Sequence, residues 1–151
     1  MCLDAQTSRE LTGRERLEAL MESARRPGIV ETLDLHLVEV DDGRVVFEGA
    51  PSRKVYNPIG SVHGGYAATL LDSACGCAVQ SKLTGAQGYT TLELKVAYHR
   101  AMTEQTGPVR AEGKAVTVGR RAAFAEATLK DLDGRLYASA TSTLLVFDCA
   151  A

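Results

Sequence analysis

The sequence has no large excess of either charge, few cysteines and no tryptophan. Its formal net charge at pH 7 is −2, so it lacks the broad basic surface that would attract nucleic acid or an anionic membrane. The cysteines, Cys2, Cys75, Cys77 and Cys149, have no spacing typical of a metal site and are too few for a disulfide scaffold. We therefore expect reduced thiols, no metal ion, no nucleic-acid partner and a small-molecule ligand.

Long hydrophobic runs are absent as well. Residues 1–20 contain no continuous apolar segment of the kind found in signal peptides, which predicts a cytoplasmic protein. The most apolar stretch, residues 64–81, is interrupted by polar residues, among them Thr69, Asp72 and Gln80. It falls short of the roughly 18 uninterrupted apolar residues that a transmembrane helix needs, so we predict no membrane partner.

The length and composition suit one compact domain. With 151 residues, of which 45% are hydrophobic, the chain can bury one core but would be cramped as two domains. Thr12 followed by Glu15 is a capping-box pattern that begins a short amphipathic helix, which stops by Pro27. We predict an N-terminal segment over residues 1–28, with this helix packed outside the domain or on a neighbouring subunit, and a single domain over residues 29–149.

Extended segments surround one long helical segment, residues 64–81. Their alternation of apolar and polar side chains predicts strands at residues 33–40, 44–50, 90–100, 108–119, 121–131 and 135–147. In the third of these we expect Leu92, Leu94, Val96 and Tyr98 to share one face. A long buried helix combined mainly with antiparallel strands indicates the α+β class.

The long helical segment carries the clearest sign of function. Asp72 is its only carboxylate. A helix that is apolar around its circumference lies inside a protein, where an ionised carboxylate is destabilising unless it is paired, hydrogen-bonded or close to water. At the helix start, Gly64 and Gly65 let the backbone approach a ligand and leave unpaired N–H groups at the positive end of the helix dipole. Such groups suit a developing oxyanion, so the two features together predict an active site.

The spacing of these features predicts a dimer. Asp72 lies eight residues after Gly64, which places it about 12 Å further along the helix axis. One carbonyl group cannot contact both, because catalytic contacts are about 3 Å long. If both groups act on one substrate, an antiparallel copy of the helix must bring its own Asp72 beside the first chain's Gly64. We therefore predict an obligate homodimer with two shared sites.

At this point the motif supports a family resemblance. The pattern N-x-x-G-x-x-H-G-G begins at Asn57 and is followed seven residues later by Asp72. It resembles the signature of hotdog-fold acyl-CoA thioesterases, in particular the phenylacetyl-CoA thioesterase-like branch of the 4-hydroxybenzoyl-CoA thioesterase superfamily. The resemblance extends in weaker form over residues 33–147. It implies the hotdog fold, in which an antiparallel sheet wraps around a long central helix, and a homodimer that in this family is often a homotetramer.

The resemblance also implies roles for residues of the motif. Asp72 would activate a water molecule or attack the thioester carbonyl itself. The Gly64 N–H would bind the carbonyl oxygen, and the Asn57 amide would position the carbonyl or the carboxylate across the dimer. The structural alternatives are an acid paired with lysine or arginine at Asp72, a tight loop-to-helix connection at Gly64 and a turn former at Asn57.

Two further site residues follow from the resemblance. His63 precedes the helix, where the dipole disfavours its cation, so we expect it to orient the loop by hydrogen bonding. Thr91 corresponds to a hydroxyl residue that in similar enzymes holds the attacking water, whereas a slip of one residue would select Thr90 and the other face of the sheet. The 4-hydroxybenzoyl relatives carry a hydroxyl residue where this chain has Gly76, and its loss here favours Thr91.

Coenzyme A would enter only as part of the substrate, so no cofactor is expected. The candidates for binding its phosphates are Arg120 and Arg121, which follow Gly119 in a hairpin, with Arg100 and the Arg53-Lys54 pair as others. Exposed arginines at turns are usually only solvated, which is the alternative for each of them.

We therefore predict a thioesterase that hydrolyses an aryl- or medium- to long-chain acyl-CoA to the free acid and coenzyme A. A pocket near Tyr66, Leu70 and Tyr89 would accept either a phenylacetyl ring or an alkyl chain. The alternative is a non-catalytic acyl-CoA-binding regulatory protein of the same fold, which would be expected to lack the buried acid. Hotdog dehydratases use a histidine and an acid at a spacing that His63 and Asp72 do not match.

Overall fold

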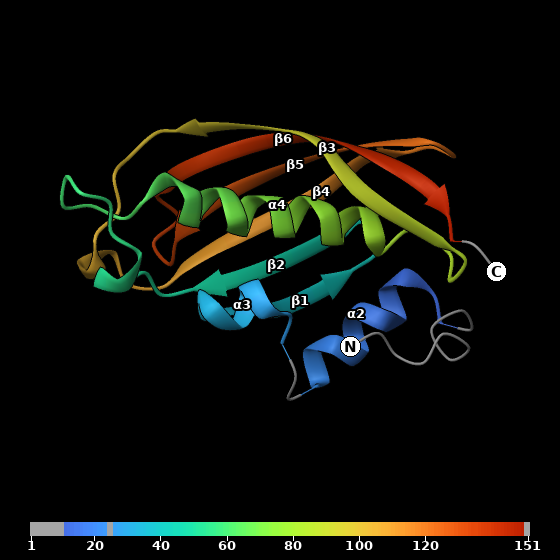
Figure 1. Ribbon diagram of the computed structural model, residues 1–151, viewed down its shortest axis with the longest axis horizontal. Helices are drawn as coiled ribbons and strands as arrows, with labels where there is room; N and C mark the ends of the chain where they lie inside the picture. The colour runs from blue at the N-terminus through green and yellow to red at the C-terminus, as the bar shows by residue number, and fades with distance from the viewer. Residues whose placement is uncertain (1–10, 24–25, 150–151) are drawn as a thin grey trace.

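The computed structural model describes residues 11–23 and 26–149 (Figure 1). In chain order its elements are α2 (Gly13–Glu22), α3 (Gly28–Thr32), β1 (Leu35–Asp41), β2 (Arg44–Gly49), η1 (Arg53–Val55), α4 (Gly64–Gln80), β3 (Gln87–Tyr98), η2 (Glu104–Thr106), β4 (Val109–Val118), β5 (Ala122–Asp131) and β6 (Leu136–Asp148). All the expected strands are present, and the core helix begins where it was predicted. The short helix α3 was not predicted, because Pro27 was interpreted only as a stop, whereas its fixed φ also suits a helix start.

The six strands form one antiparallel sheet in the order β1-β2-β4-β5-β6-β3. Figure 1 shows α4 lying along the concave side of this sheet, and α4 contacts every strand. Leu70, Leu71, Ala74 and Ala78 of α4 are fully buried. No helix of the described residues is long and apolar enough to cross a membrane. The architecture is the α+β arrangement that the pattern of elements predicted, with the core between one helix and one sheet.

Small residues let the sheet approach the helix closely. Ala123, Ala125 and Ala127 of β5 alternate along the strand and are buried. The closest approach is at Gly113 of β4, where an added Cβ would overlap the carbonyl group of Ala74 in α4. At this point the backbones of β4 and α4 are in contact, so only a residue without a side chain fits at position 113.

We expect Gly113→Ala to lower the free energy of unfolding by about 2 to 3 kcal/mol, because the Ala74 carbonyl cannot yield without moving α4. Denaturant unfolding followed by circular dichroism measures this. Gly28→Ala is the matched control, since a Cβ at Gly28 meets no atom within 4 Å. Equal stability of the two variants would contradict the close approach of β4 to α4.

A β-bulge at Leu92 changes which side chains of β3 face the helix. The register between β3 and β6 shifts between Thr91 and Glu93. Before the bulge Thr91 points towards α4, whereas after it Leu94 and Val96 pack against the core. Leu92 itself is 62% exposed, so the prediction that it shares a face with Leu94 and Val96 is wrong. One extra residue in a strand reverses the alternation of its side chains.

Helix α2 is fastened to the far end of α4. The predicted capping box is present, with the Glu15 carboxylate accepting from the Thr12 N–H at 2.7 Å. The Gly13 N–H donates to the Leu83 carbonyl oxygen at 2.9 Å, and Leu17 is 1% exposed. The helix therefore packs on the outside of the domain in this chain, which is one of the two positions expected.

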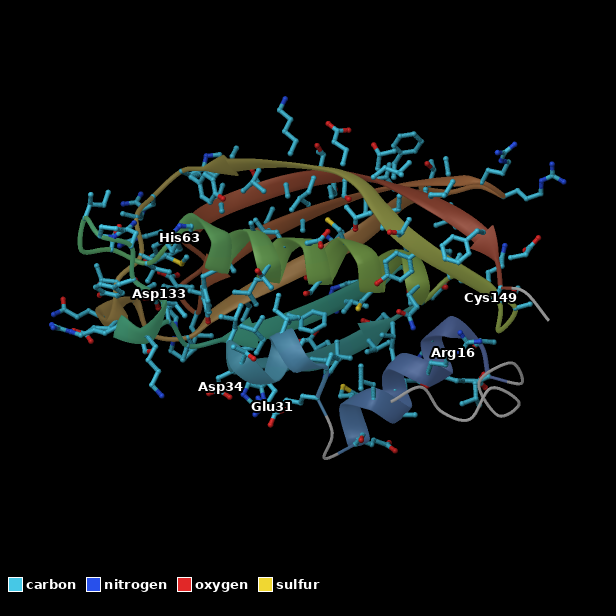
Figure 2. The ribbon with its side chains drawn as sticks, in the orientation of Figure 1. Arg16, Glu31, Asp34, His63, Asp133 and Cys149 are labelled. Atoms are coloured by element: carbon cyan, nitrogen blue, oxygen red, sulfur yellow. The ribbon has the colours of Figure 1, made fainter. Side chains whose placement is uncertain are left out.

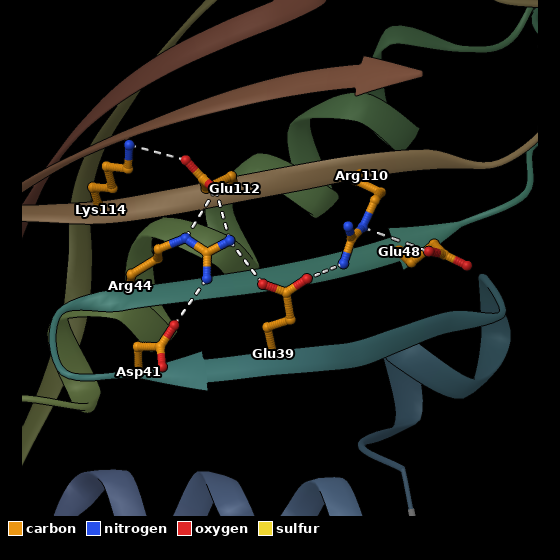
Figure 3. Close-up of polar contacts among 7 residues, drawn as sticks. All are labelled: Glu39, Asp41, Arg44, Glu48, Arg110, Glu112 and Lys114. Carbon is orange, nitrogen blue, oxygen red and sulfur yellow. Dashed lines mark hydrogen bonds and ion pairs between the residues drawn. The ribbon is translucent and has the colours of Figure 1, made fainter. Parts of the chain in front are cut away.

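The outer face of β1, β2 and β4 carries a network of ion pairs (Figure 3). Its members are Glu39, Asp41, Arg44, Glu48, Arg110, Glu112 and Lys114. Arg44 Nη2 lies 2.7 Å from Glu39 Oε2 and Nη1 lies 2.9 Å from Asp41 Oδ2, and the hydrogen bond to Glu39 is the main cause that raises the pKa of Arg44. Glu112 and Lys114 alternate along β4 with Gly113, which faces α4. The charged network therefore lies on the side of the sheet away from the helix.

Candidate active site

Asp72 and Thr91 are joined across the interior of the fold. The Thr91 hydroxyl, on β3, donates a hydrogen bond of 3.0 Å to Asp72 Oδ1 in the middle of α4. Both side chains are partly buried, whereas Thr90 is exposed. Of the two threonines that the sequence left open, Thr91 is therefore the one that contacts the carboxylate. Among the described residues, no lysine, arginine or histidine forms an ion pair with Asp72, which does not favour a purely structural acid.

A cavity of about 590 Å³ opens beside this pair. Asp72, Ser73 and Cys77 line it from α4, and Tyr89, Thr90 and Thr91 line it from β3. The remaining wall comes from β1, β2 and the α2–α3 segment, which comprises α2, α3 and the described residues between them, Ser23, Arg26 and Pro27. Carboxylate and hydroxyl groups thus meet at one wall of a largely apolar cavity, which is the usual composition of a small-molecule site.

Tyr89 occupies the space that a side chain at position 76 would need, which accounts for the glycine there. A Cβ at Gly76 would lie 2.8 Å from the Tyr89 ring and its hydroxyl, so the ring occupies the space of a larger side chain. Burial raises the pKa of the Cys77 thiol to about 12, and it also raises the pKa of its partner Tyr89. Cys77 is therefore protonated at neutral pH.

The predicted pocket residues are not all in this cavity. Tyr89 lines it, but Leu70 is 0% exposed and Tyr66 is 3% exposed, so the placement of these two in the pocket is wrong. Both are core residues because they lie on the side of α4 that packs into the sheet. Desolvation raises the pKa of Tyr66 to about 12, and its hydroxyl has no hydrogen-bond partner among the described residues.

His63 caps the N-terminus of α4. Its ring nitrogen Nδ1 accepts a hydrogen bond of 2.8 Å from the Gly65 N–H. The backbone N–H of His63 donates to the Val55 carbonyl oxygen at 2.8 Å. Figure 2 shows His63 at the start of α4, near the loop that leads into the helix. The ring thus caps the helix through its acceptor nitrogen, while the backbone N–H of His63 joins the helix start to the loop before it.

The next backbone group, the Gly64 N–H, remains available. None of the described residues accepts a hydrogen bond from it. The Gly64 carbonyl accepts one of 3.0 Å from the Tyr98 hydroxyl, which ties the helix start to β3. A free N–H at the positive end of a long helix is a suitable donor to a carbonyl oxygen that gains negative charge. The sequence predicted only that Tyr98 shares one face of its strand with apolar residues, and no sequence signal indicated its contact with Gly64.

Asn57 closes the loop before α4. Its Oδ1 accepts hydrogen bonds of 3.1 Å from the N–H groups of Ile59 and Ser61, and its Nδ2 donates to Ser61 Oγ at 3.0 Å. These contacts are those of a turn former, the alternative that the sequence left open. One amide hydrogen of Asn57 remains for a contact outside the loop.

Gly64 and Asp72 open onto different cavities of the chain. Gly64 lines a second cavity of about 350 Å³ together with Tyr98, His99 and Arg100, and Asp72 does not reach it. The two residues lie on one continuous helix, about 12 Å apart along its axis. A single chain therefore does not bring the carboxylate and the free N–H to one carbonyl group.

The candidate phosphate-binding arginines differ in their surroundings. Arg120 and Arg121 are exposed at the tip of the β4–β5 hairpin and line neither cavity. Arg53 is held by Glu104, with Nε 2.9 Å from Oε1. Arg100 lines the cavity of Gly64. Of these candidates, Arg100 is the one that shares a cavity with the free backbone N–H.

Known proteins resemble this chain in both sequence and structure. The sequence profile of the thioesterase superfamily matches residues 59–138. A 1,4-dihydroxy-2-naphthoyl-CoA hydrolase from Listeria monocytogenes is 27% identical over 119 residues, which are 79% of this chain and 95% of the relative. The structure of a thioesterase family protein from Silicibacter pomeroyi has a TM-score of 0.79 at 26% identity, and the match covers 90% of this chain and 98% of that one. A candidate thioesterase related to phenylacetic acid degradation, from Ralstonia eutropha, gives a TM-score of 0.77 at 25% identity, covering 85% of this chain and 98% of that one.

This chain belongs to the thioesterase superfamily. Its antiparallel sheet wrapped around α4 is the hotdog fold that the motif implied, and the protein is a thioester hydrolase. The predictions of family, fold and enzyme class are confirmed.

Proposed function

We propose that this protein hydrolyses an acyl-CoA thioester to the free acid and coenzyme A, with Asp72 as the reacting carboxylate. The observation that carries the proposal is the hydrogen bond between Thr91 and Asp72 at the wall of the larger cavity. It fixes the direction of a carboxylate that forms no ion pair with a cation of the described residues, and in this proposal its second oxygen, Oδ2, acts on the substrate.

Two routes fit this geometry. In the first, Asp72 takes a proton from water as the water oxygen attacks the thioester carbonyl carbon. The C–S bond then breaks, and the departing thiolate of coenzyme A receives that proton from Asp72. In the second, Asp72 attacks the carbonyl carbon itself, expels the thiolate and forms an anhydride that water hydrolyses. In both, the carbonyl oxygen becomes negatively charged and would be stabilised by the Gly64 N–H.

The active unit in this proposal is a homodimer with two shared sites. Asp72 and Thr91 of one subunit would face Gly64 and Asn57 of the other, since within one chain Asp72 and Gly64 line separate cavities. His63 would support Gly64 through its cap on Gly65. Association of dimers to a homotetramer and a cytoplasmic location remain predictions from the sequence.

Coenzyme A would extend from the carbonyl site towards positive charge. Arg120 and Arg121 remain candidates for its phosphates, and Arg100 is favoured by sharing the cavity of Gly64. The names of the relatives support an aroyl or arylacetyl thioester, because one is a 1,4-dihydroxy-2-naphthoyl-CoA hydrolase and another is related to phenylacetic acid degradation. A regulatory protein without activity is disfavoured by the presence of the oriented carboxylate.

Thiol release from a panel of acyl-CoA esters tests the proposal. The panel contains acetyl-, butanoyl-, octanoyl-, dodecanoyl-, phenylacetyl- and benzoyl-CoA, and free coenzyme A is measured with a thiol reagent. We expect turnover with at least one member in the absence of added metal. Binding of these esters without thiol release would support the regulatory alternative instead.

Thr91→Val is expected to lower kcat by about 10- to 100-fold, because a hydrogen bond to a charged group contributes about 1.5 to 3 kcal/mol and orients the carboxylate. The matched control is Thr117→Val, which makes the same change on β4, at an exposed position that lines neither cavity. Steady-state kinetics of both variants measure the effect. If the two lose activity equally, the bond between Thr91 and Asp72 has no part in the reaction.

A further inference from the structure

The larger cavity extends from Asp72 and Thr91 to a wall outside the central helix and sheet. That wall is the α2–α3 segment, whose side chains Leu20, Met21, Ile29 and Val30 line the cavity. Figure 1 shows α2 and α3 beside β1, at the open side of the sheet. The residues of α2 and α3 that line the cavity are apolar, and Ser23 and Arg26, between the two helices, add polar atoms to the same wall. We infer that the α2–α3 segment is the acyl-binding wall of the enzyme and that Met21 and Ile29 determine the size of the acyl group.

The exposure of these two side chains supports the inference. Met21 is 41% exposed and Ile29 is 57% exposed, although both are large and apolar. They converge on one cavity, to which Leu37 and Phe47 add apolar surface from β1 and β2. Scattered exposed apolar residues need no explanation, but a convergent set beside a reactive carboxylate is the composition of an apolar ligand site.

Contacts with the rest of the domain hold one end of this wall in place. Arg16 of α2 donates to the Gly85 carbonyl oxygen, and Leu17 is fully buried. Gly13 is packed so closely on α4 that a Cβ would overlap the Gln80 carbonyl oxygen. One end of α2 is thus fixed to α4, while its last turn carries Leu20 and Met21 over the cavity.

Size and charge then define the class of acyl group. A cavity of about 590 Å³ has room for on the order of 20 groups the size of a water molecule, each of about 30 Å³. Arg26, at the same wall, is paired with Asp34 at 2.9 Å, so its charge is already balanced. The structure therefore fits a large uncharged acyl group, either an alkyl chain of about eight carbons or more or a fused ring system. This inference rests on the proposed function.

Two tests use substitutions that narrow the cavity. Met21→Trp and Ile29→Trp are expected to lower the ratio of kcat/KM for dodecanoyl-CoA over butanoyl-CoA at least about tenfold, since apolar pockets discriminate by steric fit. Ala19→Trp and Glu31→Trp are the matched controls, because these positions lie on the same two helices, are exposed and do not line the cavity. A ratio that changes less than twofold in both narrowing variants would overturn the inference.

A binding measurement separates this inference from the proposed function. The chain contains no tryptophan, so the tryptophan of Met21→Trp is the only one and reports on its own surroundings. In the Asp72→Asn background, dodecanoyl-CoA at a concentration that saturates this variant should shift its emission to shorter wavelength, whereas coenzyme A alone should not. An emission shift in the variant, without any hydrolysis by the wild type, would support the acyl-binding wall and refute the thioesterase proposal. Hydrolysis without a shift, or no binding of any acyl-CoA, would refute the acyl wall.

Discussion

Asp72→Asn is expected to lower the rate of thioester hydrolysis by at least about a hundredfold while leaving the fold intact. The amide has nearly the shape of the carboxylate, and its oxygen can still accept the hydrogen bond from Thr91. It can neither take a proton from water nor attack a carbonyl carbon, so both proposed routes are blocked. Thiol-release kinetics measure the loss, and circular dichroism checks the fold.

The control for this substitution is Asp133→Asn. Asp133 is an exposed acid in the turn between β5 and β6 and lines neither cavity, so its neutralisation changes the net charge equally without altering the lining of the site. Its turnover should match the wild type. Turnover of Asp72→Asn within a few-fold of the wild type would remove Asp72 from the mechanism.

Gly64→Pro is expected to lower kcat by about 10²- to 10³-fold, because it deletes the backbone N–H that would stabilise the oxyanion. Gly64 is the first residue of α4, after the cap His63, and proline is well tolerated at this position of a helix. The added Cβ would lie 3.0 Å from the Tyr98 ring, which is 56% exposed and can move aside. Gly64→Ala adds the same Cβ but keeps the N–H, so it separates steric effects from the loss of the donor.

Mixing the two inactive variants tests whether the sites are shared. In a dimer of one Asp72→Asn subunit and one Gly64→Pro subunit, one site has both defects and the other combines an intact Asp72 with an intact Gly64. After co-refolding in equal amounts, about half of the dimers are mixed, and activity should recover to about a quarter of the wild type. If each chain contained a complete site, the mixture would stay as inactive as its components.

Thr91 shows why the site could be predicted from the sequence only in part. Alternation along a strand predicts which residues share a face, but it needs a register, and the bulge at Leu92 changes that register in the middle of β3. The prediction that Leu92 shares a face with Leu94 and Val96 is therefore wrong, and alternation alone could not decide whether Thr90 or Thr91 faces the carboxylate. Their roles separated only when the pairing of β3 with β6 placed Thr91 against α4.

The acyl-binding wall could not be predicted for a related reason. The capping box at Thr12 and the apolar spacing identified α2, because both are local signals. Which side of α2 would face a cavity depends on its attachment at Gly13 to residues near the end of α4, about 70 positions later in the chain. Tyr66 and Leu70 were assigned to the pocket for the same lack of information, since helix periodicity alone does not say which face the sheet covers.

The sequence by itself determined the helix with its single carboxylate, the glycine pair at its start, the positions of the strands along the chain and the family, because these depend on local periodicity and on a contiguous motif. The tertiary structure alone decided that Thr91 orients Asp72, that Gly64 and Asp72 open onto different cavities, and that α2 and α3 complete the larger one. Each of these facts is a contact between residues distant in sequence, and such contacts follow from the curvature of the sheet and the packing of α4 within it.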